Sequence, residues 1–244
     1  MCASSGLYAF PSLNTLNQNP VIILEGYGTS QSVIKKLNAK HSIYLQCGFK
    51  KIKLIVQETN EGEFKLTQAI LKPAEQLQIG LVYVLHIDGL PEYESLSKWN
   101  NETQAHEQIA WKIVKRKDNV KSEWVNKPRE IGKTLKHYGC GPERHVNFSY
   151  SVSDSSGCFI KAIVTNIKTR KTTSYFLNDW DNQNNTIEIG HGMCSGAFRL
   201  DGDTFEVSFI LMDESGNITE WTGDKIKFTQ PTKEEEQEFL PPSR

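Results

Sequence analysis

The sequence lacks the features that would place it across a membrane or on nucleic acid. No apolar run approaches the roughly 18 residues that span a bilayer, and the longest run near the start covers residues 21–24. No basic start followed by an apolar stretch marks a secretory signal peptide. The net charge is −1, from 28 basic and 29 acidic residues, so no basic excess is present to bind phosphates. We therefore expect neither a transmembrane segment nor a nucleic-acid partner.

The local motifs of the common enzyme classes are also missing. The sequence has no Gly-x-Ser-x-Gly elbow, no P-loop, no His-Glu-x-x-His zinc motif and no dinucleotide-binding glycine pattern. Distant residues could still assemble a catalytic site, so a hydrolase without a local motif stays as the third functional hypothesis. The expectation is a protein that is not an enzyme and that needs no cofactor.

Short apolar segments are present throughout, with turn residues between them. In the stretch 145–153, polar and apolar residues alternate strictly, so Val146, Phe148, Tyr150 and Val152 would share one buried face. Many short strands separated by turns are typical of β-sandwiches and barrels. The strands predicted in this way are residues 21–25, 43–47, 51–57, 65–71, 82–88, 109–114, 145–153, 158–166, 172–177, 186–189, 197–200, 204–212 and 225–229.

A change of composition divides this pattern into two parts. Residues 115–122 are charged, and Pro128 follows shortly after. Linkers between domains are typically polar, exposed and rich in such residues. The predicted organisation is a polar tether over residues 1–19, a first domain with its linker over 20–127, a second domain over 128–231 and a charged tail over 232–244.

Two segments resemble known β-modules. In residues 66–87, Pro73 would stop one strand, Leu77 would fill the loop, Gly80 would make a turn and Tyr83 would begin the next strand. This segment resembles the closing hairpin of bacterial extracellular immunoglobulin-like domains of the S-layer type, and residues 205–219 resemble a hairpin common in such repeats. The resemblance implies an all-β fold of two tandem immunoglobulin-like antiparallel β-sandwiches, a location in the cell envelope or outside the cell, and no catalysis.

The first residues bear on the location. Residues 1–6 look like the mature start of a bacterial lipoprotein, in which Cys2 would carry the lipid and anchor the protein to the envelope, with the outer membrane as one expected site of attachment. The alternative is an unmodified cysteine that happens to be second in the chain. Because no signal peptide is found, we expect that either the protein is cytosolic or its signal has been removed.

Two cysteines and two histidines in glycine-rich segments form the main candidate site of the second domain. A disulfide between Cys140 and Cys194 would suit an oxidising compartment. Alternatively, Cys140, His145, His191 and Cys194 have the donor chemistry of a tetrahedral zinc site. The third possibility is unpaired thiols and incidental histidines.

Trp180 is the best candidate for an exposed aromatic contact, because it lies among polar residues in a predicted loop. The leading hypothesis is a non-catalytic structural or binding protein of the cell envelope, lipid-anchored through Cys2, with a protein or glycan partner. The alternative is a metal- or carbohydrate-binding module centred on the second domain, with zinc as the metal.

Overall fold

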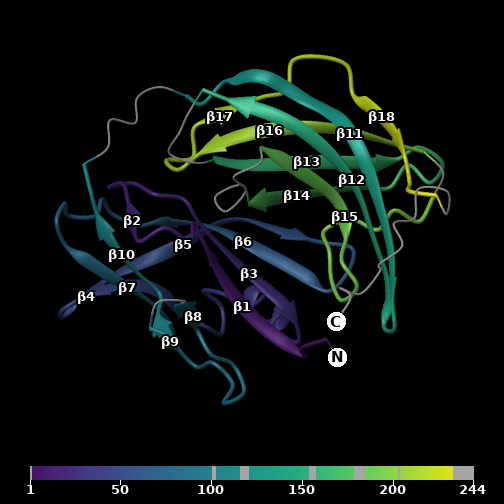
Figure 1. Ribbon diagram of the computed structural model, residues 1–244. Coiled ribbons are helices and arrows are strands. Elements are labelled where there is room, and N and C mark those ends of the chain that lie inside the picture. Colours follow the sequence, from purple (N-terminus) through teal and green to yellow (C-terminus); the bar gives the residue numbers. More distant parts are fainter. Residues whose placement is uncertain are drawn as a thin grey trace.

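The computed structural model describes residues 2–100, 103–115, 121–153, 158–178, 185–202 and 204–232. Within these ranges the chain is built from β-strands, and its only helix is the four-residue α1 (Gln31–Ile34), so the all-β prediction is confirmed. No helix of the described part is long and apolar enough to cross a membrane. Figure 1 shows the strands in two stacked halves, with β1–β10 below and β11–β18 above.

The first half is an eight-stranded sheet that folds back on itself at β5, its long central strand. The strand order is β1-β3-β6-β5-β4-β7-β10-β2. The early residues of β5 pair with β4 and its later residues with β6, with a register shift between Val56 and Glu58. We call β1, β3, β6 and the later part of β5 sheet A, and the remainder sheet B. The bounds are β1 (Ser5–Phe10), β2 (Thr15–Leu16), β3 (Ile22–Gly28), β4 (Ile43–Cys47), β5 (Lys50–Glu61), β6 (Leu66–Pro73), β7 (Val82–Ile87) and β10 (Ala110–Ile113).

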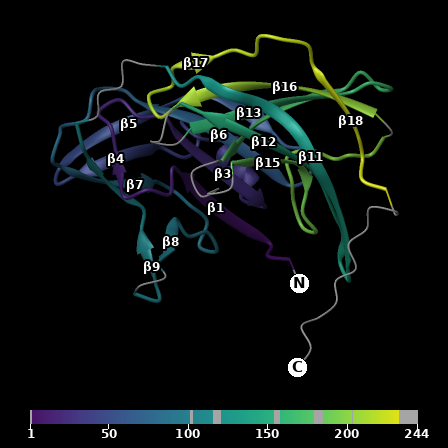
Figure 2. The ribbon, with the colours of Figure 1, turned by 45° about the horizontal axis from the view of Figure 1, so that its top comes forward.

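Sheets A and B enclose the first core. Sheet A contributes Ile22 and Leu24, which pack with residues of sheet B such as Leu45 and Trp111. A separate hairpin, β8 (Ser97–Asn100) with β9 (Ala105–Gln108), projects from this half in Figure 2.

The tether predicted for residues 1–19 is wrong. Strand β1 pairs along its whole length with β3, and β2 adds a parallel strand beside β10. The reason is that Leu7 and Leu16 are buried in the first core, and the Trp111 indole N–H donates to the Pro11 carbonyl over 3.1 Å. The surrounding Asn and Ser residues concealed these contacts in the sequence.

The second half has two antiparallel sheets. Strand β12 carries the predicted alternation: Val146, Phe148 and Tyr150 are buried, and Val152 packs against the same core. Sheet C has the order β11-β12-β15, and in sheet D the order is β14-β13-β16-β17, with β18 also paired to β16. The bounds are β11 (Trp124–Tyr138), β12 (Gly141–Val152), β13 (Cys158–Asn166), β14 (Thr172–Asn178), β15 (Thr186–His191), β16 (Thr204–Asp213), β17 (Ile218–Thr219) and β18 (Ile226–Thr229).

The two halves share a buried layer, and the three cores give the packing order B-A-D-C for the four sheets. In this layer Ile23 and Ile70 of sheet A pack against Phe159, Phe176 and Met212 of sheet D. Sheet A is therefore buried on both faces, which explains the nearly continuous burial along β3 and β6. Of the predicted linker, residues 116–120 lie outside the described part, and the immunoglobulin-like topology stays a prediction.

Candidate functional site

A cavity of about 340 Å³ lies in the layer between the two halves. Its sheet A side is formed by strands β1, β3 and β6. The opposite side of the cavity is formed by β14, an edge strand of sheet D, and β15, an edge strand of sheet C. Sheet A covers the space between these two edge strands. The lining includes Phe10, Ile23, Glu25, Leu66, Gln68, His145, Phe159, Tyr175, Phe176, Glu188, His191 and Ser195.

Strand alternation places a carboxylate in this layer. Successive side chains of a strand point to opposite faces, so Glu25 shares the face of Ile23, whereas Leu24 points into the first core. Across the sheet, Glu25 lies opposite Tyr8 of β1 and Gln68 of β6. Three neighbouring strands therefore bring one acid, one phenol and one amide into a row.

Glu25 is bound by a tyrosine from the other half. The Tyr175 hydroxyl donates to a Glu25 carboxylate oxygen over 2.6 Å. Burial raises the pKa of the Glu25 carboxyl, and the hydrogen bond from Tyr175 opposes that rise only in part. Burial and the neighbouring Glu25 together raise the pKa of Tyr175, so Tyr175 stays a donor. No lysine or arginine is among the described residues that line the cavity.

Polar contacts fix the two walls to each other. The side-chain amide of Gln68 donates to the Phe176 carbonyl over 3.1 Å and accepts from the Phe176 N–H over 2.8 Å. It thereby satisfies the edge of β14 as a neighbouring strand would. An ion pair joins Glu58 to Lys161, which also lies 5.1 Å from the centre of the Phe176 ring. These contacts join the two walls of the cavity directly.

The two predicted histidines meet at the wall of this cavity. The register of β12 with β15 pairs His145 with Gly190 and Arg144 with His191. Burial lowers the pKa of His145, although the carboxylates of Glu188 and Glu143 act in the opposite direction.

The side chain of His191 is buried, and its Nδ1 lies 2.9 Å from the Gly192 carbonyl. Because a carbonyl only accepts, Nδ1 carries the hydrogen of this bond. Gly196 lets the following loop approach, since a Cβ there would lie 2.2 Å from the Cβ of His191.

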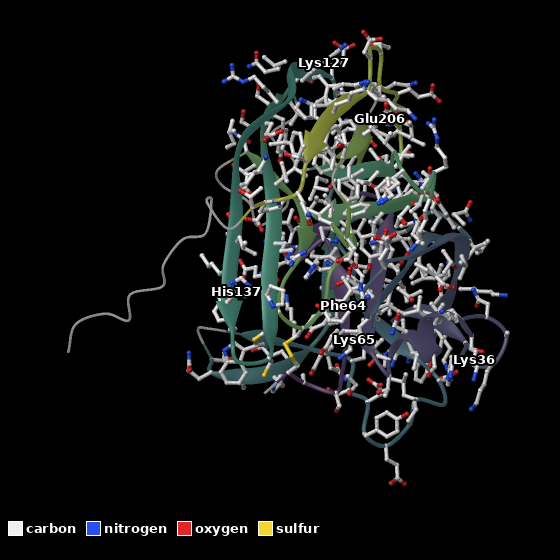
Figure 3. All side chains as sticks on the ribbon, turned by 90° about the vertical axis from the view of Figure 1, so that its right-hand side faces the viewer. Lys36, Phe64, Lys65, Lys127, His137 and Glu206 are labelled. Atoms are coloured by element: carbon white, nitrogen blue, oxygen red, sulfur yellow. A yellow bond between two sulfur atoms is a disulfide. The ribbon has the colours of Figure 1, made fainter. Side chains whose placement is uncertain are left out.

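The predicted disulfide between Cys140 and Cys194 is wrong. Cys194 is bonded to Cys2, with 5.7 Å between their Cα atoms, and Cys140 is an exposed thiol. The cause lies in the N-terminal strand, whose start is held beside β3 by a hydrogen bond from the Tyr27 hydroxyl to the Ala3 carbonyl. The loop that carries Cys194 is in turn paired with Phe64 of the first half through two backbone hydrogen bonds. Both loops therefore converge on one place, and Figure 3 labels Phe64 where the two halves meet.

The predicted zinc site is also wrong. The Cys194 sulfur is engaged in the disulfide and is not a thiolate ligand, and Cys140 is exposed. Across the described ranges, no three side chains of His, Cys, Asp or Glu come together as a metal site would require.

Two further expectations concern Cys2 and Trp180. The Cys2 sulfur cannot hold a thioether-linked lipid while it is bonded to Cys194, so lipidation at Cys2 stays a prediction that competes with the disulfide. Trp180 lies outside the described residues.

A second hollow, of about 280 Å³, lies between β1 and the β8–β9 hairpin. Tyr8 and Trp99 are about half exposed beside it, and the edge of the His106 ring meets Trp99 with 5.2 Å between ring centres. Its lining is mainly apolar and includes Trp111. The arrangement offers exposed aromatic faces at one side of the first half.

Sequence reasoning missed Glu25, Gln68 and Tyr175 as site residues. One signal for Glu25 was available: it continues the alternating face of an otherwise apolar strand, where a solvated position would not be expected. No comparable signal marked Gln68 or Tyr175, because their roles arise only from the packing of sheet A against sheet D.

Comparisons with known proteins give only remote structural likeness. Two structures of the pullulanase from Anoxybacillus sp. LM18-11, one of them in complex with maltotriose, are 8% identical with TM-scores of 0.25, and the matches cover 87% and 89% of this chain. The S-layer protein rSbsC is 12% identical over 89% of this chain, with a TM-score of 0.28. The chain spans only 24% and 25% of the pullulanase chains and 34% of the S-layer chain. No family model and no curated protein sequence matches.

Proposed function

We propose that this is a non-catalytic binding protein of the cell envelope or the extracellular space, built from two immunoglobulin-like β-sandwiches, and that it binds its ligand in the cavity between them. The observation that carries the proposal is a cavity of about 340 Å³ that contains a carboxylate without a cationic partner among the described lining residues. Ligand sites are typically concave and mostly apolar, with a few fixed polar groups and volumes of about 300–1,000 Å³.

The surroundings of the two histidines support binding rather than catalysis. Nucleophilic catalysis by a serine or cysteine commonly uses a histidine base within hydrogen-bonding distance of the hydroxyl or thiol. In the part of the chain that the structure describes, His191 bonds to the Gly192 carbonyl, and His145 lies 3.7 Å from the Glu143 carboxylate. Neither histidine is paired with a nucleophile, although Ser195 lines the same cavity.

The disulfide supports the proposed location. Disulfide bonds persist in secreted and envelope proteins and are rare in reducing compartments. The bond between Cys2 and Cys194 joins residues 192 positions apart and ties the first half to the second beside the cavity. An envelope or extracellular protein would gain from such a covalent link between the two walls of its site.

A thermal-shift screen with a cavity-filled variant tests the proposal. Ser195→Phe would occupy the cavity, and Ser42→Phe, at an exposed position in the first half, is the matched control. We expect that some compounds of the screened library raise the melting temperature of the wild type and of Ser42→Phe but not that of Ser195→Phe. The proposal fails if no compound separates Ser195→Phe from the other two proteins.

A carbohydrate ligand at the Tyr8–Trp99 hollow is the second candidate function. Its support is the pair of half-exposed aromatic rings, since sugars commonly stack on such faces. A glycan array with the wild type and Trp99→Ala tests it. Binding that Trp99→Ala abolishes supports this function, whereas no binding by the wild type rejects it.

A further inference from the structure

We propose that the cavity between the halves binds a small organic cation, an amine attached to an apolar group, with Glu25 as its counter-ion. This inference rests on the proposed binding function and adds the chemical class of the ligand. It follows from three properties of the lining: its charge, its free acceptor and its aromatic rings.

The charge of the lining is negative and is not balanced from within. Glu25 and Glu188 are its acidic residues, and no lysine or arginine accompanies them among the described residues. A neighbouring hollow of about 430 Å³ shares Phe10, Glu25, Leu66 and Ser195, and its described lining also contains no lysine or arginine. Glu25 therefore lies between two spaces that no described lysine or arginine lines. An enclosed carboxylate is stabilised by a partner of opposite charge.

Three cations near the same interface are engaged elsewhere. Lys161 forms its ion pair with Glu58. Lys65 and Arg199 lie over the Phe64 ring, at 5.5 Å and 4.9 Å from its centre, and Figure 3 labels Phe64 and Lys65 at the junction of the halves. None of these three basic side chains lines the cavity, so a cationic ligand would supply a charge partner that they do not.

Glu25 retains an acceptor for such a ligand. The Tyr175 hydroxyl bonds to Oε2 of Glu25, and in the described part of the chain this is the side-chain hydrogen bond that Glu25 makes. Oε1 is thus available to accept from an ammonium group. Hydrogen bonds between charged partners are about twice as strong as those between neutral ones.

Aromatic rings favour the same class of ligand. Phe10, Phe159, Phe176 and Tyr175 contribute to the walls, and Ile23 and Leu66 complete the apolar surface. The face of an aromatic ring attracts a cation within about 6 Å. The apolar body of the ligand would pack against these side chains while its amine reaches Glu25.

Calorimetric titration with three matched probes tests the inference. The probes are phenethylamine, the neutral phenethyl alcohol and the anionic phenylacetate. We expect the wild type to bind the amine at least about tenfold more tightly than either analogue, as the loss of one charged hydrogen bond predicts. This comparison needs no variant, so misfolding cannot obscure it.

Two variants assign the effect to Glu25. Glu25→Gln keeps the shape of the side chain and an acceptor for Tyr175, and should weaken amine binding about tenfold or more. Glu75→Gln is the matched control, since Glu75 is an exposed partner of Lys50 far from the lining, and it should leave binding unchanged. If Glu25→Gln binds the amine as tightly as the wild type does, the inference is overturned.

The two proposals fail in different ways. If phenethyl alcohol or phenylacetate binds as tightly as the amine, and Ser195→Phe abolishes that binding, the cationic class is wrong while the binding site stands. If the three probes and the whole library fail to bind the wild type, the inference and the proposed function fall together.

Discussion

The two faces of sheet A are made by alternate residues of the same strands, yet they differ in chemistry. Toward sheet B, Ile22, Leu24 and Leu71 belong to an apolar core and are fully buried. Toward sheet D, Ile23 shares the surface with Glu25 and Gln68, and a cavity remains. The face toward sheet B therefore belongs to the core of the first half. The face toward sheet D joins the two halves and lines the cavity between them.

This difference shows how an interface between two sheet layers can acquire a site. Packing in a core leaves few voids larger than a water molecule. Where sheet A covers the edge strands β14 and β15, the side chains leave a cavity. Polar residues such as Glu25 and Gln68 are tolerated there because partners across the layer, Tyr175 and Phe176, satisfy them.

The largest contrast should come from truncating neighbouring residues of β3. Leu24→Ala opens a void in the filled core and should lower the free energy of unfolding by about 4 kcal/mol. Ile23→Ala enlarges an existing cavity and loses fewer contacts, so we expect about 2 kcal/mol. Urea denaturation of both variants measures the difference. Equal losses, or a larger loss for Ile23→Ala, would contradict the contrast between the faces.

Removing the disulfide tests how strongly it holds the two halves together. Cys2→Ser removes the bond to Cys194 and should lower the free energy of unfolding by about 3 kcal/mol, a typical value for a native disulfide. Reduction of the wild type should have the same effect, whereas Cys140→Ser should have little. An unfolding midpoint that reduction leaves unchanged would speak against this bond.

The amide bridge between the halves can be broken alone. Gln68→Ala leaves the N–H and carbonyl of Phe176 without these partners in a buried place and should lower stability by about 2 kcal/mol. Gln46→Ala removes an exposed amide hydrogen bond to Gly48 and should change stability by less than about 0.5 kcal/mol. The prediction is refuted if the two substitutions are equivalent in denaturation.

The smallest effect concerns the charge on Glu25. Burial raises the pKa of Glu25 in the folded state above its ordinary value of 4.5. The free energy of unfolding therefore falls as the pH rises from 4.5 to the raised pKa, and above that pKa the contribution of protonated Glu25 to stability is lost. Glu25→Gln should therefore be more stable than the wild type at neutral pH and equally stable at acidic pH below 4.5. Thermal unfolding across this range measures it, and a Glu25→Gln protein less stable than the wild type at neutral pH would be the opposite result.

The sequence predicted the elements better than their surroundings. Strict alternation identified β12 correctly, because each buried residue there faces one core. It could not show that sheet A is covered on both sides, since alternation states which residues share a face and not what lies against it. The failure at residues 1–19 has the same origin: Leu7 and Leu16 are single apolar residues among polar ones.

The candidate site was predicted in part. His145 and His191 do meet, because their strands are paired in register, although the zinc they were expected to bind has no ligand set. Glycine-rich loops suggested that Cys194 forms a disulfide, but its partner depends on where β1 begins in space. Glu25 and Tyr175 are 150 residues apart, and no local pattern relates them.

The titration of Glu25 tests the central claim most directly. Carbon-detected nuclear magnetic resonance of the side-chain carboxyl, with Glu25→Gln to assign the signal, gives its pKa in the folded protein. A carboxylate enclosed between the halves without a cation predicts a midpoint above 4.5, which amine binding then lowers. A midpoint at or below 4.5 in the free protein would show that Glu25 is solvated or already paired, and would contradict the account of this site.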